Sequence, residues 1–458
     1  MAAGIPPESI RKEPSMAFDN EEMKRRRELR EKQRQQRIAQ QKRLRLRLLI
    51  AAAVLVVCGV LIFVVSRNRG SQSAVVPSQT GGQAVQTTAP AAQAEETEVP
   101  ATTAPPTSTV ELTFAGDLNV NDAVVNAGGI TRDYSSVFMD VLPLLTDADL
   151  TVLNFEGNAV GQPYGTETCS APGELLDELG SAGVDMVQVA NSRTITNGMS
   201  GLASTLYAIR NAGLEPLGAY ASVSDAKKAG GYTIKEVNGV TIAFVAFTKG
   251  MDSMALPEGS ERCVNVLYED YATTYQNVDY DGIRSVLKAA ASERPDITIA
   301  LLHWGSEYND VVSETQEEIV ELMHDEGVDA IIGTHPHYVQ AIEYDETAGT
   351  FLCYSLGDFI SDATRAGTEY SIILDLEITK DNDTGKTRIT GYSYTPIYTV
   401  AENDTLKVVR LDEAVKAYEE NNIDAVNDGT YSSMTYAQTR VEERVSPDAA
   451  DTTEATDE

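Results

Sequence analysis

Histidine and carboxylate side chains recur in this sequence where short apolar segments end. Asp117 closes "VELTFAGD", His303 closes "DITIALLH", and His335 and His337 close "IIGTHPH". Three of the four histidines in the chain fall at such positions. Imidazole and carboxylate groups can move protons, and together they are ligands that suit Mn, Fe or Zn. If the apolar segments are neighbouring strands, their polar ends could converge on one metal site.

Four more polar residues occupy equivalent positions and extend the candidate site. Asn154 and Glu156 end "VLNFEG", Asn191 follows "VQVA", and Asp358 ends "YSLGD". A histidine at the end of a strand is often a hydrogen-bonded structural residue rather than a ligand, so that alternative stays open. The combination predicts a divalent metal, either Mn, Fe or Zn, held by ligands from several segments. The predicted metal ligands are Asp117, Glu156, His303, His335 and His337.

The elements that must position these residues alternate between strand and helix patterns. Apolar, β-branched segments such as "LTVLNF" and "VTIAFVAF" are separated by amphipathic segments such as "MSGLASTLYAIRNAG". This alternation predicts an α/β domain, and strands without polar alternation are typical of sheets covered on both faces. In such sheets the carboxyl ends of the strands line the ligand crevice. After Ser371 long strand-like segments predict an antiparallel edge, followed by a short helix at "LDEAVKAYEEN".

An uncharged segment at residues 48–65, "LLIAAAVLVVCGVLIFVV", is long enough to cross a bilayer as one helix. A signal peptide is the alternative, but its apolar core would be shorter and would precede a small-residue cleavage site. Residues 1–47 are rich in Lys and Arg and predict a cytoplasmic N-terminal segment, with the main domain extracellular in a single-pass protein of the cell membrane. The basic segment could instead bind anionic lipid or nucleic acid, although a topology signal is the simpler explanation.

The charge of the chain is unevenly distributed. Residues 1–70 hold 16 Lys/Arg against 7 Asp/Glu, although the whole chain has a formal net charge of -33, so the remainder is strongly acidic. An acidic domain repels phosphates, so no nucleic acid is expected as a partner of the main domain. Residues 66–108 are rich in Ala, Thr and Pro and predict a disordered stalk. Cys169, Cys263 and Cys353 allow one disulfide, with no indication of which pair would form it.

Five segments, in order, resemble the motifs of the CapA family of bacterial capsule (poly-γ-glutamate) synthesis proteins. They are "LTFAGD", "ADLTVLNFEG", "LLHWGSEYN", "IIGTHPHYVQAIE" and "YSLGDF". The resemblance implies a four-layer α/β/β/α sandwich like that of the calcineurin-type metallophosphoesterases, with the five predicted ligands at its metal site. The CapA-like domain is expected at 109–400, followed by an acidic C-terminal extension at 401–458 that is partly helical and then disordered. The implied partners are an anionic capsule or wall polymer and capsule-synthesis membrane proteins.

One loop departs from the family pattern, which usually reads Ala-Asn-Asn-His. This sequence has "ANSR" at residues 190–193, so Ser192 replaces the expected metal ligand and Arg193 replaces a histidine expected to act as an acid or to stabilise charge. Arginine cannot usefully donate a proton near neutral pH, but it can hold a phosphate or carboxylate through two parallel hydrogen bonds. The loop therefore loses acid–base capability and keeps the ability to bind an anion. The residues predicted to bind the anion or substrate are Arg193, Ser192, Asn154 and Asp358.

Three functions remain open from the sequence. The first is a surface-anchored factor for capsule-polymer assembly, with a partly degenerate metal site that binds rather than cleaves. The second is a working metal-dependent phosphoesterase or polymer hydrolase, with Arg193, Asn191 and His303 as its catalytic residues. The third is a purely structural wall protein whose site has been lost. The choice among them rests on the site and not on the fold, because one fold hosts many activities.

Overall fold

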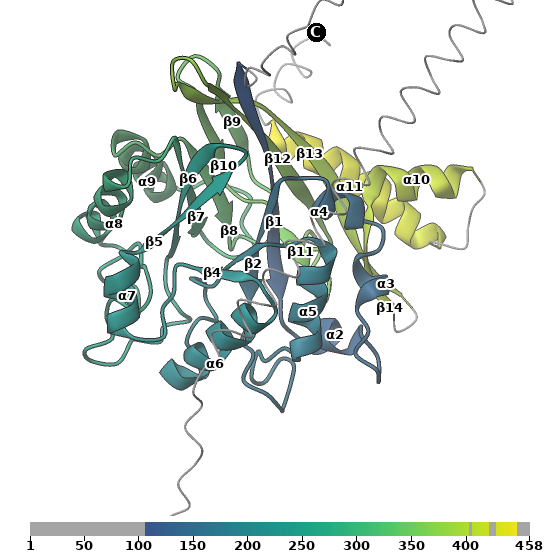
Figure 1. Ribbon diagram of the computed structural model, residues 1–458. Coiled ribbons are helices and arrows are strands. Elements are labelled where there is room, and N and C mark those ends of the chain that lie inside the picture. The colour runs from purple at the N-terminus through teal and green to yellow at the C-terminus, as the bar shows by residue number, and fades with distance from the viewer. Residues whose placement is uncertain (1–105, 403–404, 421–426, 447–458) are drawn as a thin grey trace, which may run out of the picture. The chain divides into compact units, whose positions relative to one another are not determined.

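The computed structural model describes residues 106–402, 405–420 and 427–446 (Figure 1). The predicted cytoplasmic segment (1–47) and membrane helix (48–65) lie outside the described residues, as does almost all of the predicted stalk (66–108). No helix in the described part of the chain is long and apolar enough to cross a membrane. The first strand starts at Thr107, two residues before the predicted start of the domain.

Eight strands form the larger sheet, in which a parallel half adjoins an antiparallel half. The order is β14-β13-β12-β1-β2-β3-β4, and β11 also pairs with β1. Strands β1 to β4 are parallel, whereas β12, β13 and β14 form the antiparallel edge predicted after Ser371. The strands are β1 (Thr107–Asn119), β2 (Leu150–Glu156), β3 (Met186–Gln188), β4 (Glu215–Leu217), β11 (Asp358–Ile360), β12 (Tyr370–Asp381), β13 (Thr387–Glu402) and β14 (Thr405–Arg410).

Six strands form the smaller sheet, in the order β5-β6-β7-β8-β10-β9. Its four central strands are parallel, and the two edge strands are antiparallel to their neighbours. Strands β7 and β8 are buried along their whole length, as their lack of polar alternation predicted. The strands are β5 (Tyr232–Val237), β6 (Val240–Thr248), β7 (Ile297–His303), β8 (Ala330–Thr334), β9 (Ile342–Asp345) and β10 (Thr350–Cys353).

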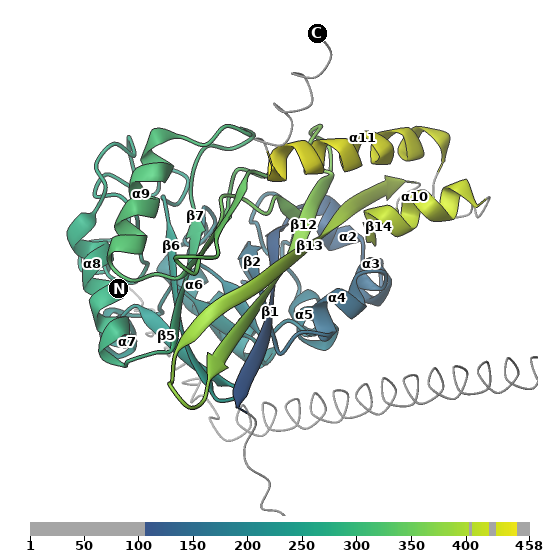
Figure 2. The same ribbon diagram turned by 90° about the horizontal axis from the view of Figure 1, so that it is seen from above.

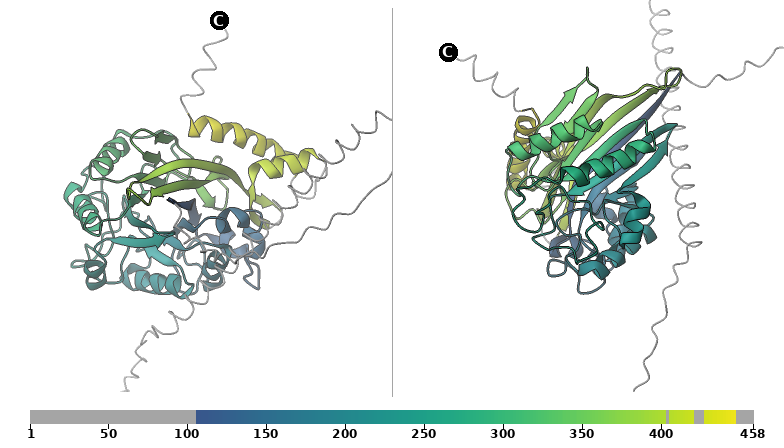
Figure 3. Two further views of the ribbon diagram at one scale, coloured as in Figure 1. Left: turned by 45° about the horizontal axis from the view of Figure 1, so that its top comes forward. Right: turned by 90° about the vertical axis from the view of Figure 1, so that its left-hand side faces the viewer.

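The two sheets pack face to face, and helices cover their outer faces (Figures 1 and 2). One apolar core lies between the sheets and includes Phe114 and Leu374 of the larger sheet with Phe244 and Ile299 of the smaller sheet. A second core packs α2 to α6 on the larger sheet, and a third packs α8 and α9 on the smaller sheet. The predicted α/β sandwich is therefore confirmed, and its layers follow the order helix, sheet, sheet, helix (Figure 3).

The helices of the described chain are mostly short. They are α2 (Asp122–Asn126), α3 (Ser135–Phe138), α4 (Leu142–Thr146), α5 (Gly173–Ala182), α6 (Gly198–Asn211), α7 (Val223–Ala229), α8 (Tyr280–Ser292), α9 (Glu314–Asp325), α10 (Leu411–Glu419) and α11 (Asp428–Val445). Local signals fix the ends of α9. Its N-cap Ser313 and Gln316 form a reciprocal capping box, which satisfies two N–H groups at the helix start. Gly327 follows the helix with φ 87°, a conformation that favours glycine.

The C-terminal elements β14, α10 and α11 belong to the same domain, which differs from the predicted boundary at residue 400. Strand β14 pairs with β13, and α10 and α11 contribute apolar residues to the core that contains both sheets. The buried face of α11 has a spacing of three and four residues, as an amphipathic helix requires. Serine, threonine and charged residues between these positions hide that periodicity in the sequence. The buried residues of α11 are Met434, Ala437, Val441 and Val445.

The three cysteines of the described chain, Cys169, Cys263 and Cys353, are all free and buried. The disulfide that the sequence left open is therefore not formed among them. Burial raises the pKa of Cys353 to about 12, because the thiolate would lose its hydration. A thiol that stays protonated is a poor nucleophile and a poor metal ligand, which suits a packing role for this residue.

Gly116 allows strand β1 to approach the turn before β11, and this approach positions Asp117. A Cβ atom at Gly116 would lie 1.8 Å from the carbonyl oxygen of Gly357. The backbone N–H of Asp117 donates a hydrogen bond to that same oxygen at 3.0 Å. The register of β1 against β2 also shifts at this point. Only glycine can therefore occupy position 116 without moving the backbone that carries Asp117.

We expect Gly116→Ala to lower the free energy of unfolding by roughly 1–3 kcal/mol or more, because the methyl group must push two backbone segments apart. Chemical denaturation of the full-length chain measures this change. Gly391→Ala in β13 is the matched control, since a Cβ atom there would meet nothing within 4 Å. The control should change stability by less than about 0.5 kcal/mol. Equal stability of the two variants would contradict the structural role of Gly116.

Candidate metal centre

Strand register places the polar side chains of the larger sheet side by side at the carboxyl ends of its parallel strands. Asp117 of β1 lies opposite both Asn154 of β2 and Asp358 of β11. Two residues further on, Asn119 lies opposite Glu156. Because side chains two apart on a strand project to the same face, the second pair shares the face of the first. The larger sheet therefore presents carboxylates and amides at one edge, as expected of an α/β crevice.

The histidines come from the smaller sheet. His303 ends β7 and lies beside Thr334, the last residue of β8. The chain then turns through His335 and His337, whose φ angles are 94° and 60°. Non-glycine residues rarely adopt such angles, and residues that do are enriched at functional sites. The backbone N–H of His335 donates to the carboxylate of Asp117 at 3.0 Å, so a residue of one sheet holds the turn of the other.

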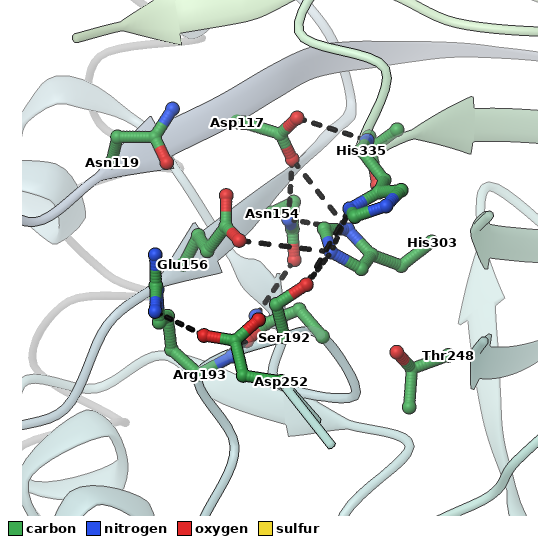
Figure 4. A network of polar contacts seen from close by, with 12 residues as sticks. Asp117, Asn119, Asn154, Glu156, Ser192, Arg193, Thr248, Asp252, His303 and His335 are labelled. Carbon is green, nitrogen blue, oxygen red and sulfur yellow. Dashed lines mark hydrogen bonds and ion pairs between the residues drawn. The ribbon is translucent and has the colours of Figure 1, made fainter. Parts of the chain in front are cut away.

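One group of potential ligand atoms gathers around His303 and His335 (Figure 4). Nε2 of His303 lies 3.1 Å from Nδ1 of His335 and 3.7 Å from Oε1 of Glu156. The hydroxyl of Ser192 lies 3.0 Å from the first nitrogen and 3.4 Å from the second. One atom from each of Glu156, His303 and His335 lies within 4.8 Å of the others. This spacing lets three atoms share a metal ion, whose bonds to such ligands are about 2.0–2.2 Å long.

A second group forms around His337. Its Nδ1 lies 2.7 Å from Oδ1 of Asp358 and 3.6 Å from Oδ2 of Asp117. The amide of Asn119 donates to Asp358 at 2.9 Å. Single atoms of Asp117, Glu156 and His337 also lie within 4.8 Å of one another. Glu156 belongs to both groups, so the structure brings all five predicted ligands into one continuous cluster.

Asn154 and Asn191 form a hydrogen-bonded frame for this cluster. The amide nitrogen of Asn154 donates to Asp117 and lies 3.3 Å from Nδ1 of His303. Its carbonyl oxygen accepts a hydrogen bond of 3.0 Å from Asn191, which also donates to the backbone oxygen of Phe155 at 2.8 Å. Both side chains are buried and engaged with other protein groups. The placement suits residues that position others, and their roles in catalysis and anion binding stay predictions.

Burial dominates the electrostatics of the carboxylates. Asp117 has no exposed surface, and Glu156 is 3% exposed. Burial raises the pKa of Asp117 to about 6 and that of Glu156 to about 8, because a charged carboxylate loses its hydration in a poorly polarisable interior. The charge of His337 lowers both pKa values but does not outweigh burial, and the charge of Asp358 raises them further. Without a cation in the cluster, these carboxyl groups hold protons at unusually high pH.

The three histidines behave differently from one another. Burial lowers the pKa of His303 and of His335 well below the usual value, so both rings are neutral near pH 7, as metal ligands must be. Burial also acts to lower the pKa of His337. The neighbouring carboxylates, Asp358 first among them, outweigh burial and raise that pKa well above its usual value. His337 therefore carries a positive charge that partly offsets the buried carboxylates.

The residues present fit a divalent metal ion. Oε2 of Glu156 is buried and has no hydrogen-bond partner in the described structure, unlike the great majority of buried polar atoms. Nδ1 of His303 lies 3.1 Å from the hydroxyl of Thr334, an outer contact of the kind that orients a ligating imidazole. Imidazole nitrogens with carboxylate oxygens suit Mn, Fe or Zn. A bound cation would also compensate buried negative charge, which otherwise costs several kcal/mol per ion.

Arg193 borders the cluster, but its guanidinium is already paired. It forms an ion pair with Asp252 in the loop after β6, next to Glu156 (Figure 4). The side chains of Arg193 and Asp252 are 38% and 36% exposed. A pair of this exposure contributes roughly 0–1 kcal/mol, so an incoming anion could replace Asp252 at little cost. Asp252 and Ser253 have φ angles of 49° and 61°, so the loop that presents the carboxylate is itself strained.

Three residues of the site were not identified from the sequence. Glu307 offers a carboxylate oxygen to both histidines of the His-Pro-His turn, and its place in the same "HWGSE" segment as His303 was a usable signal. Asn119 comes two residues after Asp117 on one strand, so the strand period of two could have found it. Asp252 lies in a loop with no local signal, because only the tertiary structure brings it to the site.

The fold and the site together define an α/β-sandwich protein with a candidate divalent-metal centre at the carboxyl ends of its strands. The family model described as "Bacterial capsule synthesis protein PGA_cap" matches residues 111–363, which is more than half of the chain. The chain belongs to this family of bacterial capsule synthesis proteins, as the sequence resemblance predicted. The matched region contains all five predicted ligands and ends before β12.

Two curated relatives are similar over most of the described domain. The PGA biosynthesis protein CapA of Bacillus subtilis (strain 168) is 28% identical over 295 residues, which cover 61% of this chain and 70% of the relative. The capsule biosynthesis protein CapA of Bacillus anthracis is 27% identical over 285 residues, which cover 60% of this chain and 64% of the relative. About a third of each relative therefore lies outside the match.

Solved structures with a similar arrangement share little sequence with this chain. The calcineurin-like phosphoesterase YfkN from Bacillus subtilis has a TM-score of 0.41 and 13% identity, covering 73% of this chain and 100% of that chain. A phosphatase from Mycoplasma pneumoniae has a TM-score of 0.39 and 13% identity, covering 63% of this chain and 94% of that chain. Structural likeness at this level says nothing about activity.

Metal binding to the cluster is expected to strengthen as the pH rises from 6 to 8. Glu156 and Asp117 must release protons to act as ligands, and their pKa values of about 8 and about 6 place that release in this range. His303 and His335 are already neutral and add no further dependence, and His337 keeps its proton as long as it stays outside the coordination sphere. We therefore expect the affinity for Mn²⁺ or Zn²⁺ to rise by up to about tenfold per pH unit and to level off above about pH 8.

Titration calorimetry of the full-length chain at three pH values measures this dependence, and buffers of different protonation enthalpy count the protons released. His335→Ala removes one ligand and should weaken binding by at least about tenfold. His324→Ala is the matched control, because His324 on α9 contacts the backbone oxygen of Val328 and belongs to no ligand group. An affinity that stays constant from pH 6 to pH 8 would contradict this account, because the two carboxyl groups would then be either ionised already at pH 6 or not ligands.

Proposed function

We propose that this protein is a membrane-anchored, extracellular factor for capsule-polymer assembly, whose site binds an anionic polymer through a divalent metal and does not cleave it. Membership of the capsule synthesis family supports the process, and two relatives are named for PGA or capsule biosynthesis. The uncharged segment 48–65 and its basic flank support an anchor with a cytoplasmic N-terminus in the cell membrane. Capsule-synthesis membrane proteins are the proposed partners, and nucleic acid is not.

The observation that carries this proposal is the composition of the loop at residues 190–193 beside an otherwise complete cluster. The five ligand candidates converge, yet the loop supplies Ser192 and Arg193 where the family usually has an amide and an imidazole. A serine hydroxyl is a weak ligand, and a guanidinium cannot give up its proton near neutral pH. The site keeps groups that hold a metal and an anion, while this loop lacks the groups that transfer protons.

An anionic polymer needs a local cation to approach this domain. The chain has a formal net charge of -33, and its excess of acidic residues lies after residue 70, so a polyanion is repelled at long range. A divalent ion in the cluster would supply local positive charge, and so would Arg193 once released from Asp252. Binding would then be short-range, cation-bridged and weakened by salt.

A metal-dependent phosphoesterase or polymer hydrolase is the second candidate. Its specific support is the position of Arg193 beside Glu156, where a fixed cation could stabilise negative charge that develops during hydrolysis. A divalent metal in the cluster would act as a Lewis acid on a bound oxygen. The two candidates differ in one measurable property, which is turnover.

We expect the full-length chain, supplied with Mn²⁺ or Zn²⁺, to show negligible hydrolysis of a chromogenic phosphodiester. The double variant Ser192→Asn/Arg193→His restores an amide ligand and an acid, and it should gain roughly 10²–10⁴-fold in rate, the usual contribution of general acid–base catalysis. The matched control is Ser292→Asn/Arg262→His, which makes the same exchanges at exposed positions of other segments. The control should leave the rate unchanged.

Other outcomes separate the competing functions. Robust, metal-dependent turnover by the unmodified chain, abolished by His335→Ala, would establish the hydrolase and contradict the binding proposal. A chain that binds neither metal and shows no thermal shift with Mn²⁺ or Zn²⁺ would instead be a structural wall protein. A double variant that binds metal but gains no activity would show that the loop at 190–193 is not what silences the site.

A further inference from the structure

An aromatic ring and a cation that has no carboxylate partner among the described residues stand next to the metal cluster. Tyr308, in the loop after β7, stacks on His337 with ring centroids 5.1 Å apart and ring planes at 26°. The guanidinium carbon of Arg365 lies 3.8 Å from the centre of the Tyr308 ring. Both Tyr308 and Arg365 are exposed. An accessible cation and a candidate metal ligand therefore contact the same aromatic ring.

Arg365 differs from other arginines near the site because it has no carboxylate partner among the described residues. Arg193 is paired with Asp252, and Arg444 is paired with Asp310. The Tyr308 ring attracts this cation and its hydroxyl oxygen accepts a hydrogen bond from the guanidinium, but that leaves most of the five N–H donors of Arg365 without a protein acceptor there. Those donors remain available to a carboxylate or phosphate, which a guanidinium can bind through two parallel hydrogen bonds.

The two loops that carry Tyr308 and Arg365 are held in place before any ligand binds. The backbone N–H of Tyr308 donates to the carbonyl oxygen of Pro336 at 2.8 Å, which ties its loop to the His-Pro-His turn. The hydroxyl of Tyr338 donates to the carbonyl oxygen of Ala366 at 2.8 Å, which ties down the loop that carries Arg365. Loops held in this way lose little backbone freedom when a ligand arrives.

We propose that Tyr308 and Arg365 form an anion subsite, which binds the second acidic group of a polyanionic chain whose first group lies at the metal cluster. This inference rests on the proposed function, because it requires an anion at the cluster. Arg365 and His337 both contact the Tyr308 ring, so the cation lies beside the cluster and a chain with repeated acidic groups can place one group at the metal and another at Arg365. The subsite therefore selects chains of repeated carboxylates or phosphates over single anions, and it offers them attraction in an otherwise acidic domain.

Binding of four probes to the full-length chain in the presence of Mn²⁺ tests the subsite. The probes are a γ-linked glutamate tetramer, free glutamate, tripolyphosphate and inorganic phosphate. Arg365→Ala should weaken binding of one or both multiply charged probes by roughly five- to tenfold and leave free glutamate and inorganic phosphate unchanged. Arg262→Ala, another exposed arginine without a carboxylate partner among the described residues, is the matched control and should change nothing.

A second pair of variants isolates the ring that supports the cation. Tyr308→Phe keeps the aromatic face and should retain the affinity for the multiply charged probe, whereas Tyr308→Leu should lose it to the same extent as Arg365→Ala. The probe whose binding Arg365→Ala weakens, either the glutamate tetramer or tripolyphosphate, shows whether the ligand is a carboxylate or a phosphate chain. If Arg365→Ala and Arg262→Ala bind both chains equally well, the subsite is refuted while the proposed function stands. If the unmodified protein binds neither the glutamate tetramer nor tripolyphosphate, both the subsite and polymer binding are refuted.

Discussion

The burial of Asp117, Glu156 and Asp358 in one place is the constraint on which the rest of the structure depends. Buried carboxylates are costly unless they are hydrogen-bonded, protonated or paired with a cation. Neighbouring amides and the charged ring of His337 supply part of this compensation. The raised pKa values of Asp117 and Glu156 show that the compensation is incomplete. A divalent metal ion is the simplest remaining source, and it would also give the partnerless oxygen of Glu156 a role.

The location of the cluster could be predicted from the sequence because parallel strands bring their carboxyl ends to a common edge. Apolar segments that end in Asp117 or His303 therefore identified both the α/β class and the ligand candidates. The ion pair between Arg193 and Asp252 could not be predicted, because a strained loop from the other sheet delivers the partner. The sequence therefore predicted that the Arg193 guanidinium is free to bind an anion. The structure shows it paired with Asp252 in a partly exposed ion pair that an anion could replace.

The C-terminal helix α11 shows a second limit of the sequence and links the outer part of the fold to the site. It lies beyond the region that matches the family, yet its buried face completes the core and its basic residues reach the site loops. Arg444 lies 3.2 Å from Asp310, in the loop that carries Tyr308, and 4.7 Å from the centre of the Tyr338 ring. The rim of the cluster thus depends on a helix that the sequence placed in an extension.

The most direct test of the account is the position of bound metal in crystals of the protein grown with Mn²⁺ or Zn²⁺. Anomalous scattering measured at the absorption edge of the added metal locates the ion without reference to any activity. The account predicts a peak within bonding distance of Glu156, His303 and His335, about 2.0–2.2 Å from each coordinating atom. Crystals that contain the metal elsewhere, or that show no peak in the cluster at a pH above 8, would contradict the central claim.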